Sequence, residues 1–188
     1  MYKELSKALQ DSIEAYYRWW NDTYPNETVY AFCFFSEPLV RYAGVVVFTE
    51  EGLKKVAKEY KADEYYKNKD LVSLEKDLRW SPCDSPHHYE KEDDLNDIIF
   101  DGVNNSLNKI FHYTDSLALD DPKFEEHLSN LYSSFVKALN GFREKSLNGS
   151  QKIILSVWFG DQSEEEIKYF ITNCNGPKLI DKFNNEWQ

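Results

Sequence analysis

Apolar side chains recur at helical spacing over much of the chain. In the first segment, every third or fourth residue is apolar from Leu5 to Trp20, which is typical of a helix with one buried face. Two capping signals, Thr49 and the Ser163–Glu166 capping box, precede further stripes of this kind. The spacing predicts helices over Tyr2–Asp22, Asp93–Tyr113 and Pro122–Ser146, with shorter helices after Thr49 and Ser163 and a final one near Trp187.

Three other segments are rich in β-branched and aromatic residues and predict strands. Thr28–Ser36 is apolar on both faces, as a central strand covered by helices would be. A short break that contains a proline separates it from Val40–Thr49, and such a short connection favours antiparallel pairing. A third strand is predicted at Lys152–Asp161. The mostly polar segment from Lys61 to Asp77 predicts no particular element.

The order of these elements indicates the fold class. Two strands come early, two long helices occupy the middle, and one strand follows near the end. This order predicts an α+β fold with a small mixed or mainly antiparallel sheet packed against several helices. No internal repeat or low-complexity tract interrupts the chain, so we expect residues 1–188 to form a single globular domain.

The charge balance limits the partners. The chain has 33 acidic and 22 basic residues and a net charge of −11. Such a body is repelled by nucleic-acid backbones and anionic membrane surfaces, so neither is an expected partner. A basic protein is the favoured partner, although the acidity can also serve solubility alone.

The cysteines and the N-terminal segment favour a cytoplasmic location. Cys33, Cys83 and Cys174 lie far apart and are odd in number, which argues against a disulfide scaffold and suits a reducing compartment. The first residues lack the apolar region of a signal peptide, and no apolar run reaches the length of a membrane span.

The stretch from Leu78 to Asp94 is chemically the most varied part of the chain. Zinc sites need about four converging ligands, but Cys83, His87 and His88 are not followed by a second pair. Adjacent histidines on an extended chain also point in opposite directions. The acidic neighbours disfavour a thiolate at Cys83. We therefore interpret the stretch as a turn-rich connection anchored by Trp80, and we expect no metal and no cofactor.

Other acidic residues gather at the starts of predicted helices. There, carboxylates stabilise the helix dipole and the unpaired amides, which accounts for Asp93–Asp94, Asp120–Asp121 and Glu164–Glu166. Asp161, which follows the third strand, is the best single candidate for a functional carboxylate because loops at strand ends often carry site residues. The sequence contains no phosphate-binding loop, nucleophile elbow or zinc-protease motif.

Several motifs occur in an order that is similar to a bacterial family of unknown function, DUF4303. They are the amphipathic first helix, VYAFCFF at Val29–Phe35, LRWSP at Leu78–Pro82 and the strand ending in Asp161. The resemblance covers nearly the whole chain, although Ile171–Phe183 departs from the family pattern. It implies no catalytic residue and no established activity. Such domains look like those found beside polymorphic toxin systems, where small cytosolic proteins neutralise a toxin.

Three functions remain open at this point. The favoured hypothesis is a non-enzymatic cytosolic protein-binding module, such as an immunity protein that neutralises a basic toxin. Its predicted binding residues are Trp80, Asp84, His87, His88, Tyr89 and Asp161. The alternative is a hydrolase with a site around Asp161, His87, His88 and Cys83. A structural or regulatory homo-oligomer is the third, and the oligomeric state stays open.

Overall fold

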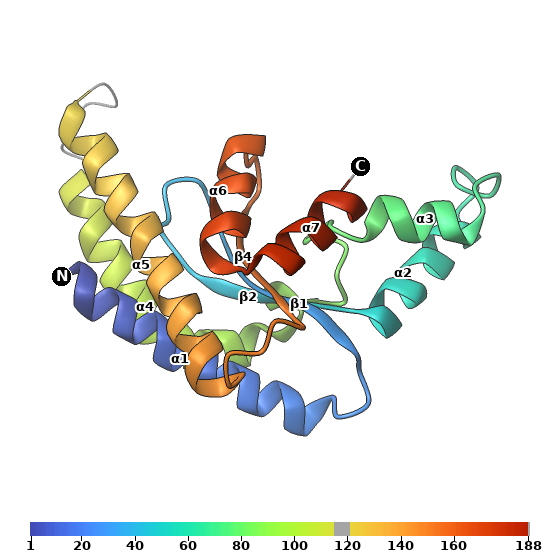
Figure 1. Cartoon of the computed structure of the whole chain (residues 1–188), viewed down its shortest axis with the longest axis horizontal. Helices are drawn as coiled ribbons and strands as arrows, with labels where there is room; N and C mark the ends of the chain where they lie inside the picture. The colour runs from blue at the N-terminus through green and yellow to red at the C-terminus, as the bar shows by residue number, and fades with distance from the viewer. Residues whose placement is uncertain (115–120, 188) are drawn as a thin grey trace.

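A four-stranded sheet lies at the centre of the fold (Figure 1). The structure, a computed structural model, describes residues 1–114 and 121–187, and its strand order is β3-β2-β1-β4. The strand β1 (Val29–Ser36) pairs antiparallel with β2 (Gly44–Thr49) and parallel with β4 (Ile154–Phe159). The two-residue strand β3 (His87–His88) pairs antiparallel with β2. The predicted α+β class with a small mixed sheet is confirmed.

The central strand β1 is apolar on both faces because helices cover both faces of the sheet. Phe32 and Phe34 belong to one hydrophobic cluster. Ala31, Cys33 and Phe35 belong to a second cluster on the opposite face. All five side chains are buried. Successive side chains of a strand point to opposite faces of the sheet, so burial of all five is expected for a strand whose two faces are both apolar.

Three long helices cover the face of the first cluster: α1 (Tyr2–Thr23), α4 (Asp93–Thr114) and α5 (Pro122–Ser146). In Figure 1, α4 and α5 lie to the left of the sheet, and α1 runs from the left to below the sheet. The apolar stripe predicted for the first helix is buried along its whole length, at Leu5, Leu9, Ile13, Tyr16 and Trp20. This stripe explains why α1 packs lengthwise against its neighbours.

Shorter helices cover the second face: α2 (Glu50–Ala62), α3 (Leu71–Leu78) and α7 (Pro177–Glu186). The helix α6 (Glu164–Cys174) follows β4 and contributes side chains to both clusters. Trp80, directly after α3, is buried in the second cluster, so its predicted role as a core anchor is confirmed.

Two short elements of the structure were not predicted from the sequence. The helix α3 lies in the segment that predicted no element, and it begins where the Asp70 carboxylate accepts a hydrogen bond from the Ser73 N–H (2.8 Å). The strand β3 is too short for a periodic pattern, and the 3-10 turn Tyr89–Glu92 follows it at once. The strand β3 forms by pairing with β2, whereas α3 has a local cap and buries Leu74 and Leu78.

The second predicted strand is shorter than expected. It starts at Gly44 and not at Val40, which has a positive φ of 56° and therefore cannot continue an extended chain. The side chain of Asn104 accepts a hydrogen bond from the Ala43 N–H (2.8 Å) just before the strand begins. The strand predicted at Lys152–Asp161 forms over the shorter range of β4.

The predicted helix caps are present wherever the structure describes them. Thr49 accepts a hydrogen bond from the Gly52 N–H, and Ser163 with Glu166 forms the capping box. Asp121 caps α5, whereas Asp120 and the side chains of the Asp93–Asp94 pair lie outside the described part. Within residues 1–114 and 121–187, no helix has the length and apolar character needed to cross a bilayer.

Candidate functional site

A cleft opens where the C-terminal end of β4 meets the turn after α3 and the end of α7. Its volume is about 560 Å³, within the range of about 300–1,000 Å³ that is usual for ligand pockets. Three tryptophans contribute to its lining, namely Trp80, Trp158 and Trp187. They come from parts of the chain that are far apart in sequence, so only the folded chain creates this surface.

The turn after α3 forms one wall of the cleft and is held by hydrogen bonds to a carboxylate. Asp84 accepts from the Tyr60 hydroxyl through one oxygen and from the Ser81 hydroxyl through the other, both at 2.5 Å. The Asp84 contact raises the pKa of Tyr60 to about 12, with burial adding to the effect. The Trp80 ring packs edge-on against Tyr30, with 5.4 Å between ring centroids. Hydrogen bonds and ring packing therefore join the turn to the core.

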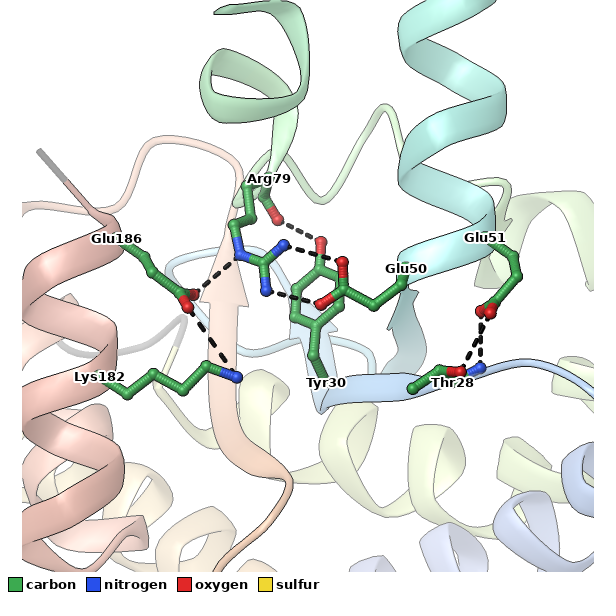
Figure 2. Close-up of polar contacts among 7 residues, drawn as sticks. All are labelled: Thr28, Tyr30, Glu50, Glu51, Arg79, Lys182 and Glu186. Carbon is green, nitrogen blue, oxygen red and sulfur yellow. Dashed lines mark hydrogen bonds and ion pairs between the residues drawn. The ribbon is translucent and has the colours of Figure 1, made fainter. Parts of the chain in front are cut away.

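An ion-pair cluster centred on Arg79 lies beside this wall (Figure 2). The guanidinium donates to both carboxylate oxygens of Glu50 (2.8 and 3.1 Å) and to one of Glu186 (2.8 Å). It also lies over the Tyr30 ring, 4.2 Å from the centroid, while the Tyr30 hydroxyl donates to the Arg79 carbonyl (2.6 Å). The hydrogen bonds from Arg79 hold the pKa of Glu50 below its usual range. One side chain thus links the start of α2, the end of α3 and the end of α7.

The free edge of β4 is closed by two amide side chains. Asn175 donates to the Leu155 carbonyl (2.7 Å) and accepts from its N–H (2.9 Å). Gln162 donates to the Val157 carbonyl (3.1 Å) and accepts from the Phe159 N–H (3.4 Å). Such capping of an edge strand disfavours the addition of another strand. We therefore do not expect a partner strand to pair with this edge.

The two predicted histidines are part of the core at the opposite edge of the sheet. His87 Nε2 lies 3.0 Å from a Glu27 carboxylate oxygen, and its ring packs against Tyr24. His88 packs against Phe35 on the other face, with 4.6 Å between ring centroids. The prediction that adjacent histidines point in opposite directions is confirmed. Both side chains are buried, so neither lies on a surface that a partner protein could reach.

The remaining predicted residues lie at different places on the surface. Asp161 is exposed in the loop between β4 and α6, next to Gly160 and Gln162 of the cleft wall. Asp84 is half-buried within the turn after α3, and Tyr89 is half-buried against Tyr42. Of the predicted binding set, Trp80 is the residue that lines the cleft beside β4.

The four residues of the hydrolase hypothesis do not meet in one site. His87 and His88 belong to β3, whereas Asp161 follows β4, at the other edge of the sheet. Cys83 lines the cleft without either histidine. Burial raises the pKa of the Cys83 thiol, and the charges of Asp84 and Glu90 raise it further. Among the described residues, no group of three or more histidines, cysteines or carboxylates is arranged to hold a metal ion.

The chemistry of Cys83 gives a direct test. We expect Cys83 to be the one cysteine that reacts with a thiol reagent in the native protein, because Cys33 and Cys174 are buried. Its reaction at pH 7 should be slower than that of the urea-unfolded chain, since a raised pKa lowers the thiolate fraction. Replacing Glu90 by Gln should speed the reaction about twofold. The rates can be followed by mass spectrometry after iodoacetamide labelling, and a native rate above the unfolded one would show an activated thiolate.

A comparison with protein-family models matches residues 5–173 to the domain of unknown function DUF4303. The chain belongs to the DUF4303 family. The resemblance seen in the first helix, VYAFCFF and LRWSP is thereby confirmed, and the matched range ends within the segment that departs from the family pattern. Searches of curated proteins and of solved structures found no match.

The sequence reasoning missed the residues that organise the site. Arg79 lies inside the LRWSP motif, between the buried residues Leu78 and Trp80. A charged residue flanked by two core residues is the local signal that could have identified it. No local sequence pattern marks Glu186 and Trp187 as site residues. Their neighbours in the cleft come from α3 and β4, which are distant in the sequence.

Proposed function

We propose that this DUF4303 protein is a non-enzymatic module that binds a basic partner protein, and that it acts as an immunity protein that neutralises a basic toxin. The observation that carries the proposal is the cleft beside β4, where the exposed ring of Trp187 lies near the side chains of Asp77, Glu164 and Glu186, while the buried rings of Trp80 and Trp158 form the floor. The proposed setting is the cytoplasm, where three unpaired cysteines would stay reduced.

Aromatic rings and carboxylates contribute to binding in different ways. Tryptophan anchors often dominate the free energy of binding at protein interfaces because they bury large areas with little loss of side-chain entropy. The overall charge of −11 attracts a basic protein over a longer range and speeds their encounter. The negative charge would thus attract a basic toxin before contact, and the aromatic side chains would contribute to binding once the two proteins are in contact.

The proposal is tested by isolating and then characterising the partner. The tagged protein is used to capture proteins from lysate of its source organism at about 0.05 M and about 0.5 M salt, because the higher salt screens exposed charges. We expect one stoichiometric partner with a basic isoelectric point. The purified partner should then associate at least tenfold more slowly at the higher salt, and its toxic activity should fall when the complex forms.

Two results would contradict this proposal. One is the absence of any stoichiometric basic partner at the lower salt. The other is a purified partner whose association rate does not change with salt or whose activity is unaffected in the complex. A variant with Asp97 and Asp101 of α4 replaced by Asn serves as a control, because both residues are exposed and far from the cleft lining. It should slow association modestly and leave the dissociation rate unchanged.

A further inference from the structure

The cleft beside β4 has an exposed aromatic ring on one side. The Trp187 side chain is 39% exposed, although it stacks on Phe183 with 5.2 Å between ring centroids. Its ring centroid lies 5.5 Å from that of Trp158, which also lines the cleft. A tryptophan held in place by two aromatic neighbours offers a pre-ordered surface for a cation.

Carboxylates outnumber basic groups in the lining of the same cleft. Asp77, Glu164 and Glu186 line it together with a single basic residue, Lys76. Glu186 is already engaged by Arg79. The other two carboxylates form ion pairs with lysines, Asp77 with Lys69 and Glu164 with Lys168, and all four of these side chains are at least half exposed.

A cation that binds these carboxylates more strongly can replace their lysine partners. Surface ion pairs contribute only about 0–1 kcal/mol, because water and salt screen them. A guanidinium that enters the cleft can hydrogen-bond to a carboxylate with two donors and stack on an indole at the same time, whereas a lysine ammonium cannot do both. The capped edge of β4 disfavours recognition by strand addition, which agrees with recognition of a side chain in the cleft.

We propose that the cleft binds an arginine side chain of the partner, with the guanidinium on the Trp187 ring and paired with Asp77 or Glu164. This inference rests on the proposed function, since it names the chemistry by which the basic partner is recognised. Trp187 and Glu186 lie beyond the residues that match the family, which end at 173. The cleft therefore has one wall from the matched region and one wall contributed by this chain's own C-terminal helix.

The indole N–H signals of the five tryptophans test the inference without the natural partner. The ¹⁵N-labelled protein, residues 1–188, is titrated with the peptide acetyl-Gly-Arg-Gly-amide and, in parallel, with the uncharged citrulline analogue. We expect the Trp187 and Trp158 signals to shift saturably with the arginine peptide, with a Kd of about 1–10 mM. Trp19 and Trp20, which pack on the other face of the sheet, should not move. The citrulline peptide should bind at least fivefold more weakly.

Matched variants separate the cleft from general charge and exposure. Glu164→Gln should weaken binding of the arginine peptide about threefold, whereas Glu165→Gln, which changes the same charge outside the lining, should not. Trp187→Ala should weaken binding about tenfold. Its control is Tyr169→Ala, because Tyr169 is also 39% exposed and lies outside the cleft lining.

The outcomes distinguish this inference from the proposed function. No saturable shift of Trp187, or equal binding of the arginine and citrulline peptides, overturns the arginine site. If a basic partner is captured and Trp187→Ala and Glu164→Gln bind it as tightly as the original protein, the arginine site is again wrong while the proposed function stands. If no basic partner exists but the peptide titration succeeds, the cleft recognises arginine and the toxin-neutralising function is wrong.

Discussion

Replacing Arg143 by methionine is expected to lower the free energy of unfolding by about 4 kcal/mol. The Arg143 side chain is 3% exposed, and its guanidinium donates to the carbonyls of Ser150, Ile153 and Cys174. It also donates to the Asn175 side chain (2.8 Å), the same amide that closes the edge of β4. Methionine fills a similar volume but leaves these acceptors unpaired in the interior, where each costs about 1–3 kcal/mol.

Urea unfolding followed by circular dichroism measures this effect. Lys137→Met is the matched control, because Lys137 lies on the same helix with an exposed side chain, and it should change stability by less than about 0.5 kcal/mol. Arg143→Lys should fall between the two, since an ammonium keeps the charge but cannot reach acceptors on both the 150–153 loop and the end of α6. A loss of less than about 1 kcal/mol for Arg143→Met would show that water replaces the guanidinium in this position.

The elements that the sequence predicted correctly are those whose burial is periodic. The stripe of α1 and the two apolar faces of β1 repeat at 3.6 and 2 residues, so the side of each element that faces the core can be read directly from the chain. The helix α3 and the strand β3 are short, and the positive φ of Val40 comes from the path of the chain between two strands. Periodicity carries no signal for such features.

The candidate site was less predictable for a physical reason. Trp80, Trp158 and Trp187 meet in the cleft through tertiary packing, and no local pattern connects them. His87 and His88 drew attention by their chemistry, but hydrophobic neighbours on the two faces of the sheet bury both rings. Arginine residues such as Arg143 are usually exposed, so composition alone suggests a surface role for a residue that lies in the interior.

Replacing Arg79 by methionine is expected to lower the free energy of unfolding by about 3 kcal/mol at pH 7. The side chain is 16% exposed, and its removal leaves the carboxylates of Glu50 and Glu186 half-buried without their guanidinium partner. The cation–π contact with Tyr30 is lost as well. Arg18→Met is the control because Arg18 is exposed on α1, and its effect should stay below about 0.5 kcal/mol.

The pH dependence of the Arg79 effect identifies the ion pair as its cause. The pKa of Glu50 is lower in the folded protein because Arg79 donates hydrogen bonds to its carboxylate. A depressed folded-state pKa adds stability that is fully present above the unfolded pKa of about 4.3 and is lost as the pH falls through the folded value. The stability gap between the original protein and Arg79→Met should therefore be constant from about pH 6 to pH 7 and shrink below about pH 4.3. A gap that stays the same down to pH 3 would show that Arg79 acts through packing of its aliphatic stem and not through Glu50.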